Sequence, residues 1–139
     1  MILLYQRLTE AVVPTKAFYT DAGYDLVATH NAVVWPHTVC NLDTGWDVKV
    51  PAGFWGSIKT RSSTFKRRKL LVLEGVIDSG YTGPLGVLVF NPTFIPKFIK
   101  KGERLAQLII LPMSIHLFEI VQQMPVTDRG PNGFGATGR

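Results

Sequence analysis

Residues 75–83 read Gly-Val-Ile-Asp-Ser-Gly-Tyr-Thr-Gly, and the interpretation of the chain starts from this stretch. Two β-branched residues precede Asp78, as at the end of a strand. Two glycines and Tyr81 follow Asp78, and glycines allow a ligand to approach the backbone closely. Because Leu85–Phe90 is apolar again, the stretch predicts a β-hairpin with a pocket at its tip. The simpler alternative is a turn in which Asp78 only caps the backbone.

Short apolar stretches recur along the chain between glycine, proline, asparagine and aspartate, and this pattern predicts strands. One short helix is expected over Thr64–Lys69, with Ser62 or Ser63 as its N-cap. So many strands in one small domain predict an all-β fold, a jelly-roll-like β-barrel with at most one short helix. The expected strands are Ile2–Tyr5, Tyr24–Ala28, Ala32–Trp35, Thr38–Leu42, Trp46–Val50, Phe54–Thr60, Leu70–Leu73, Leu85–Phe90, Leu105–Leu111 and Ile115–Val121.

The composition indicates a compact protein: 139 residues, of which 46% are hydrophobic and 18% are charged. The single cysteine, Cys40, excludes an internal disulfide, and the three histidines lack the spacing of a zinc site. The N-terminus does not resemble a secretion signal, and no apolar run approaches the ~18 residues of a membrane span. We therefore expect a cytoplasmic protein without a membrane partner.

The C-terminal segment differs in composition from the rest. From Asp128 it runs Arg-Gly-Pro-Asn-Gly-Phe-Gly-Ala-Thr-Gly-Arg, which cannot form a core by itself. Residues 133–138 match the GxGxxG pattern, but a dinucleotide loop must open a helix, and only Arg139 follows. We expect a β-barrel domain over residues 1–124 and a flexible, glycine-rich arm over residues 125–139. By itself the arm is either a disordered end or a segment that orders on a ligand.

The net charge of +5 suggests a polyanionic partner, either nucleic acid or a phosphorylated small molecule. Two clusters carry much of the excess, Lys66–Lys69 and the group of Lys97, Lys100 and Lys101. Aromatic residues are not interleaved with these clusters as a base-stacking surface requires. We therefore interpret Lys66–Lys69 as a solvated turn and expect no stable binding of nucleic acid.

Five segments share chemistry suited to a nucleotide: residues 21–26, 59–63, 75–83, 101–108 and 133–138. In order and wording they resemble the five motifs of the trimeric dUTPases, the deoxyuridine triphosphate nucleotidohydrolases. The resemblance spans about residues 14–138. It implies a jelly-roll fold, a homotrimer with each active site built from all three subunits, and Mg²⁺-assisted hydrolysis of dUTP to dUMP and pyrophosphate. That reaction keeps uracil out of DNA and supplies dUMP for thymidylate synthesis.

The resemblance also implies roles for individual residues. Asp78 resembles the carboxylate that orients and deprotonates the attacking water, and Tyr81 resembles the ring beneath the deoxyribose. Asp25 would help to hold the magnesium triphosphate through water, and Arg104 would support the site. The other implied substrate contacts are Arg61, Ser62, Ser63 and Gln107 to phosphate, the backbone of Gly75, Val76 and Ile77 to uracil, and Arg129, Phe134 and Gly135 in the arm, which would close over the site of a neighbouring subunit.

The chain departs from the family pattern in the arm. Ala136 stands where the family usually has serine, and the loss of that hydroxyl costs about 1.5–3 kcal/mol if nothing replaces its hydrogen bond to phosphate. The Pro131-Asn132 pair replaces the small residues that are common there and stiffens the arm.

Two other functions remain open at this point. The first is a dCTP deaminase or a bifunctional enzyme, which shares the fold but carries a glutamate on the strand after the hairpin; residues 85–91 contain no carboxylate. The second is a dUTPase-like regulatory protein that binds a protein or a nucleic acid.

Overall fold

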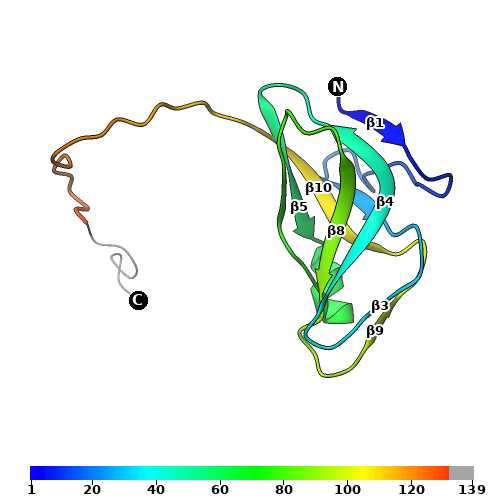
Figure 1. Cartoon of the computed structure of the whole chain (residues 1–139). Coiled ribbons are helices and arrows are strands. Elements are labelled where there is room, and N and C mark those ends of the chain that lie inside the picture. The colour runs from blue at the N-terminus through cyan, green and yellow to red at the C-terminus, as the bar shows by residue number, and fades with distance from the viewer. Residues whose placement is uncertain (132–139) are drawn as a thin grey trace.

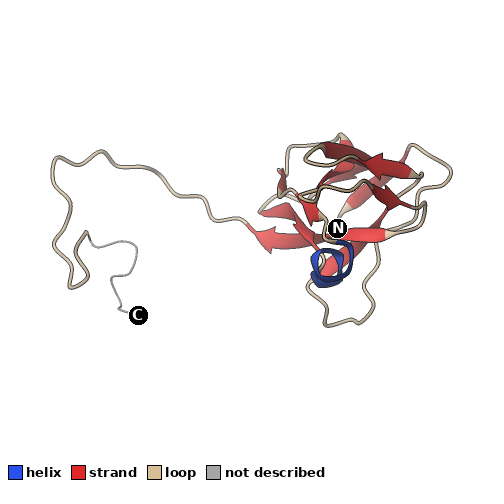
Figure 2. Cartoon of the chain, turned by 90° about the horizontal axis from the view of Figure 1, so that it is seen from below, coloured by secondary structure: helices blue, strands red, loops and turns tan. Residues whose placement is uncertain are grey.

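The fold is a sandwich of two four-stranded antiparallel sheets with a small ribbon at one end, as Figures 1 and 2 show. The structure is a computed structural model, which describes residues 1–131. The first sheet is ordered β1 (Leu3–Gln6), β4 (Val39–Lys49), β8 (Pro84–Phe90), β6 (Leu71–Val72), and the second is ordered β2 (Gly23–Val27), β10 (Arg104–Pro112), β5 (Phe54–Thr60), β7 (Gly75–Ile77). The ribbon pairs β3 (Ala32–Val34) with β9 (Lys97–Ile99). The predicted all-β jelly-roll class is confirmed.

The core lies between the two sheets, and alternation along the strands explains it. In β8, Leu85, Val87 and Val89 are buried while the residues between them are less covered. Leu26 and Leu108 from the other sheet belong to the same buried cluster. Each such side chain contributes about 1.5–3 kcal/mol by leaving water. This alternation is what a sheet covered on one face requires.

Two predicted strands, Thr38–Leu42 and Trp46–Val50, form one strand, the 11-residue β4. The polar residues between them suggested a turn. In the structure they form an irregularity in the β4–β8 register between Asp43 and Asp47, where Gly45 has a φ of 78°. Such a bulge bends a strand without ending it, and glycine supplies the left-handed conformation.

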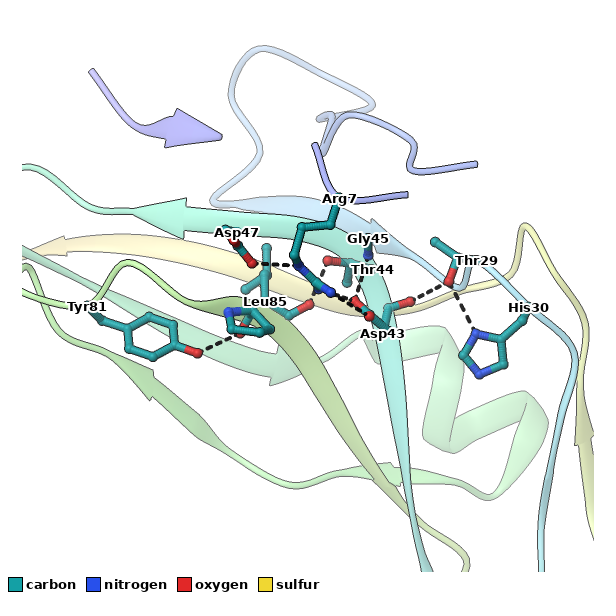
Figure 3. Close-up of polar contacts among 10 residues, drawn as sticks. Arg7, Thr29, His30, Asp43, Thr44, Gly45, Asp47, Tyr81 and Leu85 are labelled. Atoms are coloured by element: carbon teal, nitrogen blue, oxygen red, sulfur yellow. Dashed lines mark hydrogen bonds and ion pairs between the residues drawn. The ribbon is translucent and has the colours of Figure 1, made fainter. Parts of the chain in front are cut away.

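Arg7 stabilises this bulge from the chain after β1, as Figure 3 shows. Its guanidinium donates to both oxygens of Asp43, at 3.0 and 2.6 Å, and Nε lies 2.5 Å from Oδ1 of Asp47. Partial burial raises the pKa of Asp43, but hydrogen bonds from Arg7 and the Gly45 amide, with the charge of Arg7, outweigh it and leave that pKa below its ordinary value. Thr44 in the same bulge donates to the Leu85 carbonyl at 2.6 Å, which ties β4 to the start of β8.

The short helix predicted after Arg61 is present as one π-helical turn, η1 (Thr64–Arg68), and one of the two serines predicted as its N-cap holds that position. Ser63 stands at the N-cap with helical backbone angles and makes no capping bond through its side chain. Instead, the Thr64 hydroxyl donates to the Leu105 carbonyl at 2.8 Å and anchors the turn to β10. The turn ends at Lys69, which has a left-handed φ of 56°.

The hairpin predicted for the 75–83 stretch is also wrong. β7 pairs with β5 in one sheet, whereas β8 pairs with β4 and β6 in the other. Residues 78–83 therefore carry the chain from one sheet to the other. Local sequence marks the turn, but the partner of each strand is decided by distant residues.

The chain beyond β10 leaves the body of the domain, as Figure 1 shows. The strand predicted at Ile115–Val121 is wrong, because this segment has no ladder partner in the described part of the chain. Its apolar side chains Ile115, Leu117 and Ile120 are almost fully exposed. Among residues 1–131, no helix is long and apolar enough to cross a membrane.

Candidate active site

The structure brings five predicted site residues to one cavity of about 230 Å³: Asp25, Arg61, Ser62, Ser63 and Gln107. They come from three neighbouring strands of the second sheet. Gln107 on β10 is opposite Asp25 on β2 on one side and opposite Lys59 near the end of β5 on the other. Arg61 and the two serines follow β5 directly. The cavity therefore collects a guanidinium, two hydroxyls and an amide, which are donors suited to phosphate oxygens.

Asp25 fixes the guanidinium in this cavity. The Asp25 residue is only 8% exposed, and its Oδ1 accepts from Nε of Arg61 at 2.7 Å. Arg104 lies farther away, with its Nη1 3.9 Å from Oδ2. Nη1 of Arg61 also donates to the Arg104 carbonyl at 2.9 Å. With Nε and Nη1 both held, Arg61 has little rotational freedom, so the orientation of its charge is set before a ligand binds.

The position of the Gln107 side chain depends on Gly23 of the neighbouring strand β2. Its Nε2 donates weakly to the Thr60 carbonyl at 3.4 Å. A Cβ at Gly23 would lie 2.9 Å from both Cβ and Cδ of Gln107, so only glycine leaves the amide its place.

Gly23 and Asp21 also line the cavity, although neither is among the site residues predicted from the sequence. The carboxylate of Asp21 accepts from the Phe18 amide at 2.9 Å and so closes the loop before β2. The sequence feature that could have indicated both residues is the pair of carboxylates, Asp21 and Asp25, on either side of Gly23.

Asp78 and Tyr81 lie in the turn after β7. The Tyr81 amide donates to the Asp78 carbonyl at 3.0 Å, which tightens the turn, and Asp78 is exposed. The Tyr81 hydroxyl donates to the Pro84 carbonyl at 2.9 Å, a contact visible in Figure 3. A Cβ at Gly83 would lie 2.7 Å from that hydroxyl oxygen, so the glycine makes room for the ring.

The three residues predicted to read a base, Gly75, Val76 and Ile77, form β7, the edge strand of its sheet. A strand with one ladder partner leaves alternate N–H and C=O groups pointing outward. Glu74, directly before β7, pairs with Lys59 on β5. The hydrogen bond from Lys59, followed by its charge, lowers the pKa of Glu74. β7 therefore offers a fixed row of backbone donors and acceptors.

Within one chain, the cavity around Arg61 and the turn that carries Asp78 lie apart. Ile77 is opposite Gly56, so Asp78 is level with the beginning of β5, whereas Arg61 follows the end of β5 at Thr60. The six residue-to-residue steps from Trp55 to Arg61 span about 20 Å at 3.3 Å per step. A single copy therefore does not bring Asp78 to the phosphate-type cavity.

The arm residues are only partly described. Arg129 is exposed and lies in a turn closed by a hydrogen bond from the Gly130 amide to the Thr127 carbonyl. Phe134 and Gly135 lie outside the described residues. Within residues 1–131, no cluster of three or more histidine, cysteine, aspartate or glutamate side chains could hold a metal ion by itself.

Comparison with known proteins adds a sequence family to this geometry. The dUTPase family model matches residues 9–138. A protein of Schizosaccharomyces pombe named as a probable deoxyuridine 5'-triphosphate nucleotidohydrolase is 37% identical, over 99% of this chain and 99% of its own length. The deoxyuridine 5'-triphosphate nucleotidohydrolase of Mus musculus is 37% identical, over 99% of this chain and 85% of its own length.

Solved structures with a similar fold also include dUTPases. A variant of the Staphylococcus bacteriophage 80alpha dUTPase with dUpNHpp superposes with a TM-score of 0.94 at 26% identity, covering 100% of this chain and 99% of that one. Another structure of the phage 80alpha dUTPase with the same compound gives a TM-score of 0.93 at 27% identity, with the same coverage.

Proposed function

The chain belongs to the dUTPase family, and we propose that it hydrolyses dUTP to dUMP and pyrophosphate by attack of water on the α-phosphorus. The observation that carries this proposal is the cavity in which Asp25 orients Arg61 beside Ser62, Ser63 and Gln107. Its donors match a triphosphate, whose oxygens accept several charge-assisted hydrogen bonds at once. The proposed enzyme class is therefore dUTP diphosphatase.

The proposed assembly is a homotrimer with shared active sites. Asp78 and Arg61 are at opposite ends of β5, so one site requires the turn after β7 from one copy and the cavity from another. The exposed apolar side chains of residues 115–126 supply a reason to associate, because they have no cover in the described chain. The arm that carries Arg129, Phe134 and Gly135 would then close over the site of a neighbour.

Asp78 is the proposed general base. Its carboxylate holds the attacking water in line with the α-phosphorus and accepts a proton as the new P–O bond forms and pyrophosphate leaves. General base catalysis contributes typically about 10²–10⁴-fold, and fixed orientation contributes more. The short turn bond between Tyr81 and Asp78 restricts the backbone that carries this carboxylate.

The edge strand explains the proposed selectivity for uracil. Cytosine exchanges a donor for an acceptor at the pairing edge, so backbone groups of Gly75–Ile77 aligned for uracil would be left unpaired. A site built for one hydrogen-bonding pattern rejects the other by roughly 10⁴-fold. Tyr81, held by Pro84, would lie against the sugar and leave no space for a ribose 2′-hydroxyl.

Mg²⁺ fits this site as an ion that binds together with the substrate phosphates. Mg²⁺ usually keeps several waters and binds through one or two carboxylates plus substrate phosphates. Asp25, through water, would help to hold it, and Asp21 is a second carboxylate in the same cavity. When bound, Mg²⁺ neutralises charge on the phosphate oxygens. Because the substrate phosphates supply the remaining ligands, the ion does not require a cage made of protein side chains.

The test is incubation of the purified protein with each deoxynucleoside triphosphate and Mg²⁺ while pyrophosphate is monitored. We expect pyrophosphate from dUTP alone and dUMP as the other product. Release of ammonia from dCTP would instead indicate a deaminase, although β8 carries no carboxylate. No turnover of dUTP would overturn the proposal. The cytoplasmic location stays a prediction.

A further inference from the structure

The two basic clusters of the sequence lie at the same end of the molecule, the lower end in Figure 1. Arg68 joins them: its guanidinium donates to the Phe98 carbonyl on β9 and pairs with the Glu103 carboxylate. Because β9 pairs with β3 on its other side, η1, β9 and β3 are consecutive neighbours. Residues 64–69 and 97–100, about thirty positions apart in the chain, therefore form one surface.

This surface carries exposed aromatic rings. Trp35 is 60% exposed, Phe98 is 65% exposed and Phe94, in the loop before β9, is 87% exposed. Phe98 is opposite Val33 in the ribbon, so these two side chains share a face, and Trp35 follows directly after the end of β3. A hollow of about 440 Å³ beside Phe98 is lined by Val33, Asn31 and Lys100.

The loop that presents Phe94 is held firmly. Asn91 is fully buried, and its Nδ2 donates to the carbonyls of Val34 and Ile95, both at 2.8 Å. Its Oδ1 accepts from the amide and the hydroxyl of Thr93. The His37 ring packs edge-on against Phe94, with 4.8 Å between the centroids. Exposed rings on a rigid scaffold lose little entropy when a partner binds.

Exposed cations lie on η1 and at the end of β9, the two segments that Arg68 links. Lys66, Arg67 and Lys69 of the η1 turn are exposed, and so is Lys100 beside the hollow. Lys97 on β9 is partly exposed. Of the nearby carboxylates, Glu103 is paired with Arg68. The pKa of Glu10 is lowered by a hydrogen bond from its own backbone amide, then by one from Thr9, and to a lesser extent by the charge of Lys101. The electrostatic potential of this surface is therefore positive.

We infer that this surface, which we call the basic–aromatic end (Trp35, Phe94, Phe98, Lys66, Arg67, Lys69, Lys97 and Lys100), binds single-stranded nucleic acid. Stacking faces combined with a positively charged track are the features that hold single strands without a sequence preference. An acidic protein partner would satisfy the cations but has less use for several exposed ring faces. Neither basic cluster contains a stacking ring of its own in the sequence, whereas the fold places β3, with Trp35 directly after it, beside β9, and Arg68 links β9 to η1.

The test is fluorescence anisotropy of a labelled single-stranded oligothymidylate with the full-length protein at salt concentrations from about 50 to 400 mM. For single strands, the logarithm of the association constant falls with the logarithm of salt by about 0.7 per phosphate neutralised. The basic–aromatic end offers five cations, so we expect a slope of about −2 to −3.5 if three to five of them contact phosphates.

Single substitutions separate stacking from charge. Removal of one stacked ring weakens binding by roughly 5- to 150-fold, and we expect this for Trp35→Ala. Phe98→Leu keeps the apolar side chain but lacks a π face, so it distinguishes base stacking from docking of an apolar peptide. Lys100→Ala is expected to reduce the salt slope by about 0.7, while Lys49→Ala, an exposed lysine on β4 away from this surface, leaves both affinity and slope unchanged.

Hydrolysis of dUTP by each variant is the control for folding, because none of these residues lies in the proposed active site. Weaker binding of the oligonucleotide by Trp35→Ala and Phe98→Leu, at unchanged hydrolysis, supports the inference. Absence of binding at about 50 mM salt, or equal binding by wild type and both ring variants, overturns it and leaves the proposed hydrolysis intact.

Discussion

Asp25 shows how one buried carboxylate can organise a cavity without touching the reacting atoms. Its Oδ1 holds Arg61 at 2.7 Å, whereas Arg104 is at 3.9 Å and its side chain is 51% exposed. The two arginines therefore depend on Asp25 to different degrees. The close, covered pair is expected to matter for stability, and the distant, solvated one is expected to matter little.

We expect Asp25→Asn to lower the free energy of unfolding by about 1–3 kcal/mol and to raise KM for dUTP, because Arg61 loses its charged partner. Arg104→Ala is the matched control and is expected to cost less than about 1 kcal/mol. Urea unfolding and steady-state kinetics of the two variants check this. Equal effects of the two substitutions would contradict the proposed role of Asp25.

Asp78 is expected to act on the chemical step alone. Asp78→Asn keeps the size of an exposed side chain but removes the proposed base, so kcat is expected to fall about 10²–10⁴-fold. Affinity for a non-hydrolysable dUTP analogue, measured by calorimetry, is expected to stay at the wild-type value, as is the unfolding midpoint. Turnover close to wild type would remove Asp78 from the role of base.

At the scale of single elements, the turn after β7 depends on Gly83. A Cβ there would lie 2.7 Å from the Tyr81 hydroxyl oxygen and 2.9 Å from Cζ, so the ring must move and lose its bond to Pro84. We expect Gly83→Ala to lower kcat/KM for dUTP by about 10- to 100-fold, since displacement of a positioning group by 1 Å can cost that much. The preference for dUTP over UTP is expected to fall as well.

Gly80→Ala in the same turn is the control for this experiment. A Cβ at Gly80 would meet nothing within 4 Å, so we expect a change of about twofold or less. Kinetics of both variants with dUTP and UTP give the comparison. A similar loss of activity in both would mean that the turn, rather than the Tyr81 ring, is sensitive.

The bulge of β4 predicts a dependence of stability on pH. The folded-state pKa of Asp43 lies below its ordinary value of 3.8, so Asp43 stabilises the fold above that value. The contribution is lost as the pH falls through the folded-state pKa. We expect Asp43→Asn to be less stable than wild type near pH 7 and the difference to shrink below about pH 4.

Urea unfolding of wild type and Asp43→Asn at several pH values measures that difference. Asp128→Asn, in the exposed chain beyond β10, is the control and is expected to follow wild type throughout. A gap that is constant from neutral to acidic pH would show that the Arg7–Asp43 pair does not carry the effect.

These elements also show which features of the fold can be predicted from sequence. β5 has the predicted bounds because the turn that precedes it, residues 51–53, is a local signal. The cavity residues could be grouped because Asp25, Arg61 and Gln107 each lie in a short recognisable segment. The β4 bulge was not predicted, since Asp43 and Thr44 resemble turn residues, and their pairing with Arg7 and Leu85 depends on distant parts of the chain.

At the scale of the molecule, the separation of Asp78 from Arg61 was not predictable either, because it depends on the register of β7 on β5. Register is a property of the paired strands rather than of either sequence segment. The same applies to the basic–aromatic end, where the pairing of β3 with β9 brings Trp35 to the lysines. Both features are non-local consequences of the fold.

The proposed sharing of active sites between copies predicts complementation between two variants that are each expected to be inactive. When Arg61→Gln and Asp78→Asn are mixed, unfolded and refolded together, a site that takes Arg61 from one copy and Asp78 from another is intact with probability one half times one half. We expect about one quarter of the wild-type activity in a 1:1 mixture. Each variant refolded alone is the control. No gain on mixing would place both residues of a site in the same copy.

The length of β5 has a consequence for the enzyme at low abundance. Because a lone copy holds the proposed base and the proposed phosphate ligands at opposite ends of that strand, dilution below the dissociation constant of the proposed trimer is expected to remove activity without unfolding any chain. Specific activity would then rise steeply with protein concentration before it levels off. The cellular concentration of this protein would thus determine the total rate of hydrolysis and also the fraction of molecules that are active.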